Sequence, residues 1–441
     1  MKELEKKILK DPYNGYMYSY PHKKAYRYLD KVYTLEEVWK DEEMNNITLY
    51  IHIPFCKVKC AYCNLLSTNK CNNTEKEEYL RQLRNEMRLV KASLMLTKDS
   101  IDEVVIGGGT PLYLPDKQLE NLLENIKNIF NLDFKNLNIV IEASPDTLTK
   151  NKMKILKDYF VKRISVGIQS FDKLELETIG RRETYSSLNN LKKILFKEKI
   201  YKNIDLIYGI LDFDAEIWKY SLEETLKFNP EEIFIYPLYI RDYSPLKGNY
   251  SLDKNLMMEK YQFAVNYLKE KGYHQASMRN FVRSDMKDTN LGEFAGIGRK
   301  MIGIGCGARS YTNKIHYSSE YYEKEENMKK AILKYISGEN LGKVYYGIIP
   351  TEDDWKRRFL MRGLLNVMGL DIEKYQENFG TSPKEDFDEI EKLETLGYII
   401  ADKNNIKLTS KGLMYSDSIG NLFISSHVRK RMETFNEEEL L

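Results

Sequence analysis

Alternating strand-like and helix-like segments restrict the folds open to this chain of 441 residues. Between residues 48 and 237, six short runs rich in Ile, Val and Tyr are separated by longer stretches, several of which repeat their apolar residues at helical spacing. This alternation is typical of parallel βα units joined by right-handed crossovers. The expected strands are residues 48–53, 101–106, 138–142, 163–167, 203–208 and 232–237.

The number of βα units sets the expected architecture. Six units are fewer than the eight of a closed TIM barrel, so the sequence predicts an α/β fold built on a six-stranded parallel partial barrel, (βα)6. A chain of this length also has room for a smaller domain, and helix-like segments with a two-stranded wing follow residue 351. The expected parts are an N-terminal arm (1–46), the partial barrel (47–245), a barrel extension with a Gly-rich connection (246–345) and a C-terminal helical domain (346–441).

Three cysteines follow the first expected strand in the pattern C-x3-C-x2-C. Cys56, Cys60 and Cys63 lie on one short loop, so their thiolates can converge on one centre. Thiolates favour iron–sulfur clusters or zinc, and a centre with three protein ligands keeps one position open for chemistry. A structural zinc site usually needs a second cysteine pair or two histidines, but only Cys71 follows closely. The pattern therefore favours an iron–sulfur cluster over zinc or over unrelated buried cysteines.

Composition excludes several classes of protein. The net charge of +2 gives no general reason to expect binding to nucleic acid or to an anionic membrane. No stretch has the roughly 20 apolar residues of a membrane span, and the N-terminus lacks a signal-peptide core. Cys71 and Cys306 stand alone, which is typical of small apolar filler residues rather than of a disulfide framework. We therefore expect a cytoplasmic protein with no membrane span and no nucleic-acid partner.

Residues able to bind a ligand follow several of the expected strands, where the sites of α/β sheets and barrels lie. They are residues 107–110 (Gly-Gly-Gly-Thr), Glu142, Gln169 and Asp205. Gln169 and Asp205 are also typical of strand-end or helix-capping groups. His52 lies inside a strand, where a hydrogen-bonded core histidine is commoner than a catalytic one. Arg241 and Arg309 fit either contact with an anionic substrate or a surface ion pair.

The string Tyr-x-His-Ile-Pro-Phe-Cys-x3-Cys-x-Tyr-Cys, from Tyr50 to Cys63, resembles the radical SAM superfamily. It is most similar to the branch that contains the anaerobic coproporphyrinogen III oxidase and a related haem chaperone, and the likeness extends from about residue 47 into a winged-helix-like C-terminal domain. The resemblance implies that Cys56, Cys60 and Cys63 hold a [4Fe–4S] cluster. It further implies that S-adenosylmethionine (SAM) binds the open iron and yields a 5′-deoxyadenosyl radical, with one or two SAM molecules in the protein.

The same resemblance gives roles to individual residues. It implies that Tyr50 and Phe55 flank the adenine and that Tyr62 lies beside the cluster. It also implies that the amino acid moiety of SAM is held by Gly108, Gly109 and Thr110. By the same resemblance, Glu142 meets the amino group or ribose of SAM, and Gln169 and Asp205 complete the contacts. The family arginine maps to Arg181 or Arg182; Arg181 is preferred, in a bidentate pair with the SAM carboxylate. No further catalytic residue is assigned.

The resemblance implies an oxidoreductase that acts on a small molecule, with a tetrapyrrole as one candidate and reduced flavodoxin or ferredoxin as electron donor. Oxidative decarboxylation of porphyrinogen propionates is the leading reaction. Carbon methylation with a second SAM and haem delivery by a chaperone are the alternatives. Leu65 stands where the oxidase has a further cysteine, and residues 64–69 differ from both oxidase and chaperone. The motif therefore indicates the class of chemistry more closely than the substrate.

Overall fold

The computed structural model describes residues 1–13, 19–211, 215–248, 253–286 and 300–440. Its main sheet has 13 strands within these ranges, in the order β1-β13-β12-β11-β10-β2-β3-β4-β5-β6-β7-β9-β8. All six expected strands are present, adjacent and parallel. They are β2 (Ile47–Ile53), β3 (Ile101–Gly108), β4 (Asn138–Ala143), β5 (Arg163–Gln169), β6 (Tyr201–Tyr208) and β7 (Glu232–Pro237).

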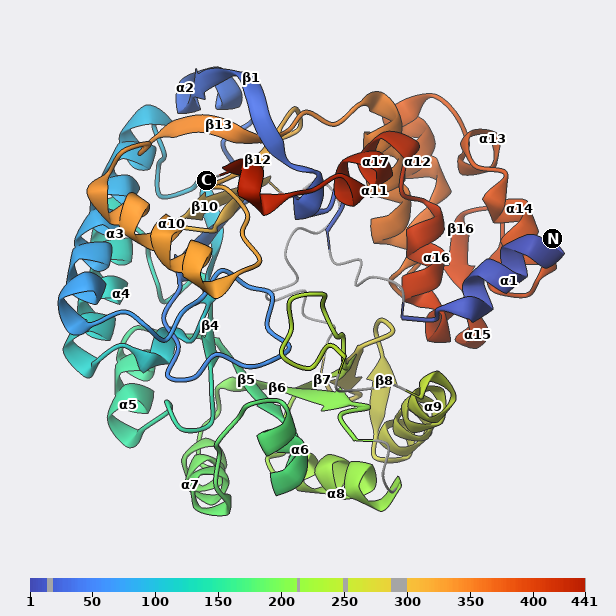
Figure 1. Ribbon diagram of the computed structural model, residues 1–441, viewed down its shortest axis with the longest axis horizontal. Helices are drawn as coiled ribbons and strands as arrows, with labels where there is room; N and C mark the ends of the chain where they lie inside the picture. Colours follow the sequence, from blue (N-terminus) through green and yellow to red (C-terminus); the bar gives the residue numbers. More distant parts are fainter. Residues whose placement is uncertain (14–18, 212–214, 249–252, 287–299, 441) are drawn as a thin grey trace.

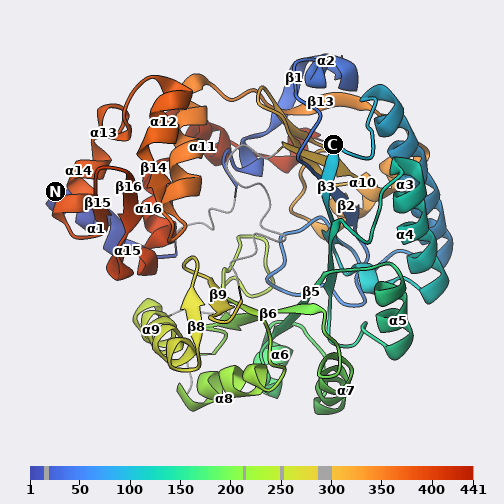
Figure 2. The same cartoon turned by 180° about the vertical axis from the view of Figure 1, so that it is seen from behind.

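Helices connect these strands and cover the outer face of the sheet, which curves around the centre of the molecule (Figures 1 and 2). They are α3 (Asn73–Ser93), η2 (Pro111–Tyr113) with α4 (Asp116–Phe130), α5 (Lys150–Asp158), α6 (Lys173–Thr178) with α7 (Tyr185–Leu195), and α8 (Ala215–Leu226). Helix α3 begins with a capping box, in which the Asn72 side chain accepts from the Glu75 N–H and the Glu75 carboxylate accepts from the Asn72 N–H. Within the described residues, every helix is too short or too polar to span a bilayer.

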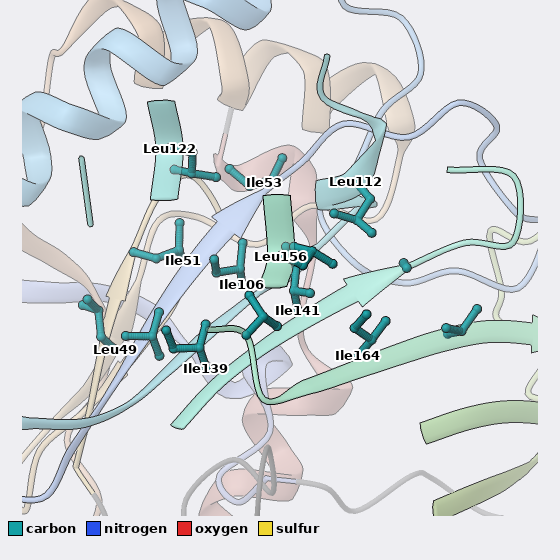
Figure 3. Packing of buried hydrophobic residues seen from close by; sticks show 14 of the residues in the cluster. Leu49, Ile51, Ile53, Ile106, Leu112, Leu122, Ile139, Ile141, Leu156 and Ile164 are labelled. Carbon is teal, nitrogen blue, oxygen red and sulfur yellow. The ribbon is translucent and has the colours of Figure 1, made fainter. Parts of the chain in front are cut away.

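Side chains alternate between the two faces of each strand, and this alternation separates core from site. In β2, Leu49, Ile51 and Ile53 are fully buried and pack with other aliphatic side chains of the sheet and its outer helices (Figure 3). The residues between them, Tyr50 and His52, line a cavity on the inner face. The other strands repeat this pattern, so the hydrophobic core holds the ligand-facing side chains in place.

Strands on both sides of β2–β7 extend the sheet beyond the predicted six. The strand β10 (Lys300–Ile304) pairs parallel with β2, within the stretch 292–307 that the sequence indicated only as Gly-rich. Residues 292–299 lie outside the described residues. The short Met-Ile-Gly-Ile run of β10 did not stand out in the sequence as a strand, because a glycine interrupts it. The added elements are β8 (Tyr273–Gln275), β9 (Asn280–Arg283), β11 (Arg309–Tyr311), β12 (His316–Ser318) and β13 (Lys343–Ile348), with helices α9 (Lys254–Glu270) and α10 (Glu325–Ser337).

The N-terminal segment joins two parts of the molecule. Its strand β1 (Arg27–Thr34) pairs antiparallel with β13 at the edge of the main sheet. Its first helix, α1 (Lys2–Lys10), packs instead on α16 (Ser416–Leu422), where the Ser418 hydroxyl donates to the Ile8 carbonyl at 3.2 Å. The remaining N-terminal elements are η1 (Lys23–Ala25) and α2 (Leu35–Trp39). The predicted arm is therefore built into both the sheet and the C-terminal part.

The C-terminal part is mainly helical and has its own hydrophobic core. The strands β15 (Ile399–Ala401) and β16 (Asn405–Leu408) form an antiparallel pair, and a third short strand, β14 (Leu370–Asp371), pairs with β16. The other elements are α11 (Glu352–Leu364), α12 (Ile372–Phe379), α13 (Pro383–Asp386), α14 (Glu389–Thr395), α15 (Ser410–Met414), α17 (Ser426–Glu433) and η3 (Glu437–Leu440).

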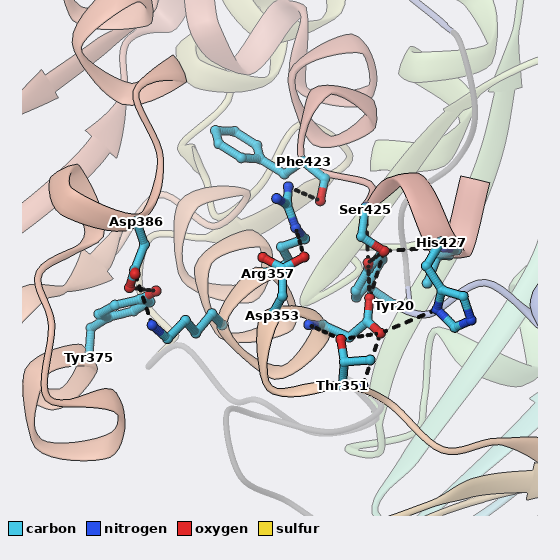
Figure 4. A network of polar contacts seen from close by, with 12 residues as sticks. Tyr20, Thr351, Asp353, Arg357, Tyr375, Asp386, Phe423, Ser425 and His427 are labelled. Carbon is cyan, nitrogen blue, oxygen red and sulfur yellow. Dashed lines mark hydrogen bonds and ion pairs between the residues drawn. The ribbon is translucent and has the colours of Figure 1, made fainter. Parts of the chain in front are cut away.

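A buried polar network ties the N-terminal segment to this C-terminal part (Figure 4). The Tyr20 hydroxyl donates to Asp354 Oδ1 at 2.7 Å, and the Ser425 hydroxyl donates to the same oxygen at 2.7 Å. Asp354 also accepts from the Thr351 N–H in the capping box of α11. Because Tyr20 lines the cavity as well, the network fixes one part of the cavity wall.

Candidate radical site at the strand ends

One large cavity, of about 1110 Å³, lies at the carboxyl ends of the parallel strands. Residues of β2–β7 and of the loops that follow them line one side, and residues of α11 and α16 line another. This volume is slightly above the roughly 300–1,000 Å³ that is usual for small-molecule sites. Of the predicted site residues, the cavity lining includes Tyr50, Cys56, Cys60, Tyr62, Cys63, Gly108, Gly109, Thr110, Glu142, Gln169, Arg181 and Asp205.

The loop with the three cysteines is held by backbone hydrogen bonds on both sides. The Cys56 N–H donates to the Thr68 carbonyl at 3.0 Å, and the Thr68 N–H donates to the Pro54 carbonyl at 2.8 Å. Further along, the Ala61 N–H donates to the Ile179 carbonyl at 3.0 Å. All three cysteines are free thiols that line the cavity. The loop thus presents three thiols to one space.

The environment of these thiols suits a cationic centre. Burial raises the pKa of Cys56 to about 12, and the neighbouring Cys63 and Cys60 raise it further. Burial also raises the pKa of Cys60, and the positive charge of the nearby Arg181 partly opposes this rise. Thiols that resist ionisation alone and lie close together release their protons when a metal centre binds.

Three thiols on one loop have the number and type of ligands that a [4Fe–4S] cluster uses, in which each thiolate binds a different iron atom. Within the described residues, no group of three His, Cys, Asp or Glu side chains is arranged to hold a single metal ion.

The glycine segment after β3 is attached to the cysteine loop. The Gly109 N–H donates to the Ile53 carbonyl and the Thr110 N–H to the Phe55 carbonyl, each at 2.8 Å. The Gly108 N–H donates to Glu142 Oε2 at 3.0 Å. Protein acceptors thus use all three N–H groups, and the role of Gly108, Gly109 and Thr110 in holding the amino acid moiety of SAM stays a prediction. Because glycine has no side chain, the backbone of this segment lies close to the cavity.

Gly108 is required at its position. Its φ is +110°, and a Cβ there would lie 2.6 Å from Cε1 of His52. The His52 ring is fixed in turn, because Nε2 donates to the Leu66 carbonyl at 2.8 Å and Nδ1 accepts from the Tyr50 hydroxyl at 3.2 Å. Burial lowers the pKa of His52 to about 4, so the ring is neutral. His52 therefore lines the cavity as a hydrogen-bonded neutral imidazole.

Two carboxylates lie deeper, on β4 and β6. Burial raises the pKa of Glu142 to about 7, partly opposed by the Gly108 N–H. Burial likewise raises the pKa of Asp205 to about 6, opposed by the Asn203 amide, which donates to Oδ1 at 2.7 Å. The Ser165 hydroxyl donates to Oδ2 of Asp205 at 3.3 Å. A ligand with donor groups or positive charge would favour the ionised form of both acids.

Gln169 and Arg181 border the cysteine loop. Gln169 has a φ of +74°, which is uncommon for a residue other than glycine, and the β5–β6 register shifts there. The Arg181 guanidinium donates to the Gly167 carbonyl at 2.9 Å and, through Nη1, to Cys60 Sγ at 3.8 Å. It also forms an ion pair with Glu183. Arg181, rather than the exposed Arg182, therefore faces the cluster loop, already bound to a protein carboxylate.

The aromatic residues of the motif have different environments. Tyr50 and Tyr62 line the cavity, and Tyr62 lies close enough to Cys60 and Arg181 for their charges to affect its pKa, which burial raises well above the usual value. Phe55 is wholly buried and packs edge-on against Tyr79 with ring centroids 5.2 Å apart. The Phe55 ring supports the loop from the core, and its predicted place beside the adenine stays a prediction.

Sequence comparison agrees with this geometry. Residues 50–221 match the radical SAM superfamily, and residues 351–415 match the family described as the HemN C-terminal domain. The chain therefore contains a radical SAM domain and a HemN C-terminal domain. Members of this superfamily use a [4Fe–4S] cluster and SAM, and the three thiols around one cavity are the residues here that suit the cluster.

Individual relatives of this radical SAM protein have two kinds of name. It is 26% identical over 392 residues to the heme chaperone HemW of Bacillus subtilis, covering 85% of this chain and 98% of the relative. It is 25% identical to the oxygen-independent coproporphyrinogen III oxidase of Helicobacter pylori, covering 83% of each. The solved structure of the Escherichia coli coproporphyrinogen III oxidase (HemN), a radical SAM enzyme, superposes with a TM-score of 0.74 at 22% identity, covering 92% of this chain and 96% of that one. The fold is therefore the α/β radical SAM fold with a C-terminal helical domain.

Two buried acceptors in the radical SAM cavity have no protein donor among the described residues. They are Oδ1 of Asn203 and Oε2 of Glu183. Buried polar atoms without partners usually mark the position of a ligand or water. The amino group and ribose hydroxyls of SAM are donors of the required kind, so the donor and acceptor pattern of the cavity fits SAM.

Sequence reasoning missed a polar cluster on the opposite wall of the radical SAM cavity. The Arg279 guanidinium binds both carboxylate oxygens of Asp417, at 2.5 and 2.6 Å, and Tyr239 donates to the same carboxylate. Asp417 belongs to α16, whereas Tyr239 and Arg279 follow β7 and precede β9. No local pattern could reveal this cluster, because its members are far apart in the sequence.

Proposed function

We propose that this protein is a radical SAM enzyme that oxidises a small molecule, with a tetrapyrrole as the leading candidate. The observation that carries the proposal is that three free thiols share one cavity with the strand-end residues Glu142, Gln169 and Asp205. When bound, the cluster and SAM supply one-electron cleavage of the sulfonium and a 5′-deoxyadenosyl radical. Cys56, Cys60 and Cys63 would hold the cluster.

The protein's own part is to orient the ligand and to exclude water. Glu142 and Asp205, with raised pKa values, would receive the donor groups of SAM, and Gln169 would position them. Arg181 would bind the SAM carboxylate only after exchanging its present partner, Glu183. Tyr50 and Tyr62 would cover the ligand on the side of the cysteine loop. This division of roles supports residues 47–245 as the catalytic part of the chain, 346–441 as a winged-helix-like cover, and the intervening 246–345 as the connection.

The reaction that we favour is oxidative decarboxylation of porphyrinogen propionates, the reaction class of the relatives named coproporphyrinogen III oxidase. Carbon methylation with a second SAM is the closest alternative, because Leu65 stands where the oxidase has a further cysteine. Reduced flavodoxin or ferredoxin would deliver the electron.

Detection of 5′-deoxyadenosine tests the enzyme directly. Anaerobically reconstituted protein, mixed with SAM and dithionite, should release 5′-deoxyadenosine and methionine in repeated turnovers. Addition of a porphyrinogen should increase the rate if the substrate is of this class. Reconstituted protein that holds four irons and sulfides but forms no 5′-deoxyadenosine would contradict the proposal.

Haem binding is a second candidate function, favoured by His52 and by the relatives named heme chaperone. His52 is neutral, lines the cavity and accepts at Nδ1 from the Tyr50 hydroxyl, a partner that a haem iron could displace. Haem titration followed by absorbance would show a shifted Soret band that the His52→Ala variant loses. An unchanged band in that variant would remove His52 as the ligand and with it the structural support for this function.

A further inference from the structure

The turn between β10 and β11, residues 305–307, packs against both ends of the cysteine loop. A Cβ on Gly305 would lie 2.7 Å from the carbonyl oxygen of His52, just before the loop begins. A Cβ on Gly307 would lie 2.8 Å from the Cβ of Leu66, just after the three cysteines. The turn has no room for a side chain at either position, so any shift of the turn is felt where the loop starts and where it ends.

Hydrogen bonds connect this turn to the start of the loop through Tyr79 of α3. The Cys306 N–H donates to the Tyr79 hydroxyl at 3.0 Å, and the same hydroxyl donates to the His52 carbonyl at 2.8 Å. The wholly buried Tyr79 ring also packs edge-on against Phe55, the residue before the first cysteine. The position of the turn is therefore transmitted to residues 52–55, which lead directly into Cys56.

Glu86 lies about two helical turns further along α3 and binds the other side of the 305–307 turn. The Gly305 N–H donates to Oε2 of Glu86 at 2.8 Å, and the Tyr335 hydroxyl of α10 donates to the same oxygen at 2.6 Å. One carboxylate oxygen thus joins α3, α10 and the turn. The described lining of the radical SAM cavity does not include Glu86, so this carboxylate lies behind the site rather than in it.

We propose that Glu86 is a positioning residue for the cysteine loop, which it holds through the 305–307 turn and Tyr79. The inference rests on the proposed function, because that function gives the loop its cluster. Glu86 touches none of the three cysteines, and it would act on the chemistry only by fixing where the loop lies.

The charge of Glu86 makes this contact dependent on pH. Burial raises the pKa of Glu86 to about 7, and the Tyr335 hydroxyl and the Gly305 N–H only partly oppose the rise. When the turn moves away, water reaches the carboxylate and its pKa returns toward the ordinary value of 4.5. The closed arrangement then holds a proton that the open one releases, so opening becomes easier as pH rises from about 4.5 to about 7 and changes little above that.

The other titratable groups around Glu86 do not ionise in this range. They are Tyr79 on α3, Tyr335 on α10, Cys306 in the turn and Tyr317 on β12, and burial raises the pKa of each. No charged side chain in the described part of the chain lies close enough to affect the pKa of Glu86. A pH dependence of the turn near neutrality is therefore assigned to Glu86 alone.

Amide hydrogen exchange of the full-length protein, purified anaerobically and measured without SAM from pH 5 to pH 9, tests the proposal. After correction for intrinsic exchange, the protection of residues 52–56 and 304–307 should fall about tenfold between pH 5 and pH 7 and then level off. Glu86→Gln keeps an acceptor without the charge, so its protection should be the same across the range. Glu78→Gln is the matched control, because Glu78 is an exposed acid of the same helix.

A second variant separates positioning from a general loss of structure. Tyr335→Phe removes a donor that favours the ionised carboxylate, so the pKa of Glu86 should rise. The fall in protection should then continue above pH 7. A role in packing alone would lower the protection equally at every pH and would leave the levelling point unchanged.

Two results would overturn the proposal. One is a pH dependence that persists in Glu86→Gln, and the other is a loss of protection confined to residues 304–307 while residues 52–56 keep theirs. The exchange measurement does not depend on SAM cleavage. Absence of 5′-deoxyadenosine would therefore contradict the proposed function without changing the exchange result, whereas cleavage together with exchange that is independent of pH would overturn the role of Glu86 alone.

Discussion

The two walls of the cavity are built in different ways. On the strand-end wall, the cysteines and the acids lie at or near the carboxyl ends of parallel strands of one sheet, so the strand pattern of the sequence indicates their positions. On the opposite wall, Tyr239, Arg279 and Asp417 come from three separate stretches and meet only because the C-terminal part packs against the sheet. The first wall has the residues expected for radical chemistry, and the second has those expected to select a substrate.

This difference between the walls indicates which residues can change the substrate specificity without loss of the radical chemistry. The strand-end wall depends on backbone contacts such as Gly109 to Ile53, which tolerate little variation. The opposite wall depends on side-chain pairs, which can be exchanged one at a time. Relatives with the same fold and different names, a heme chaperone and an oxidase, are consistent with such a division.

The largest expected effect tests the strand-end wall through its thiols. Cys60→Ala should abolish 5′-deoxyadenosine formation and reduce the iron and sulfide content of reconstituted protein, because the cluster would keep only two of its thiolates. Iron and sulfide analysis, together with the visible absorbance of the cluster, provides the measurement. Cys71→Ala is the matched control, since Cys71 is buried outside the cavity. Equal loss of the cluster in both variants would contradict the assignment of ligands.

A smaller effect, on stability, tests the opposite wall. Asp417→Ala leaves Arg279 buried without its carboxylate and should cost about 3–5 kcal/mol. We expect faster hydrogen exchange in α16 and a lower thermal midpoint, whereas the cluster content stays the same. The double variant Arg279→Met with Asp417→Leu should recover most of the loss, because it removes both charges. If the cluster content fell together with stability, the two walls would not be independent.

The contact between glycine segment and cysteine loop gives the next effect in size. Gly108→Ala adds a Cβ at a φ of +110° and 2.6 Å from His52, which should cost about 1–3 kcal/mol and weaken SAM binding. Gly380→Ala is the control, since its φ is +71° but nothing lies within 4 Å of the added atom. The free energies of unfolding of the two variants, measured in urea, separate the cost of the positive φ from the cost of the contact with His52. Equal losses would mean that the His52 contact has no energetic role.

The sequence predicted the strand-end wall well, because strand periodicity and the cysteine spacing are local patterns. The six parallel strands lie close to where the sequence places them, and helices follow residue 351 as expected. Three features of the site could not be predicted from the sequence. The Phe55 ring faces the core, the N–H groups of residues 108–110 are used by the protein, and Gln169 adopts a positive φ, which residue types alone do not indicate. The Arg279–Asp417 pair depends on how distant segments pack, which no single-sequence pattern records.

The smallest effect concerns the charge of Glu142 on the strand-end wall. Its pKa is about 7 in the folded protein against an ordinary value of 4.5, because burial disfavours the carboxylate. Between these values the folded state holds a proton that the unfolded state releases, so the stability of the protein without SAM should fall as pH rises from about 4.5 to about 7. The substitution Glu142→Gln removes this dependence on pH. The stability of the variant relative to the native protein should therefore rise over that range, by on the order of 1 kcal/mol. The figure is modest because the Glu142 side chain is partly open to the cavity. The urea midpoints of both proteins at pH 5 and pH 8 provide the measurement, with the exposed Glu77→Gln as a control for the loss of a charge. SAM should reduce the difference, because its amino group favours the ionised carboxylate; a difference that SAM leaves unchanged would place the ligand away from Glu142.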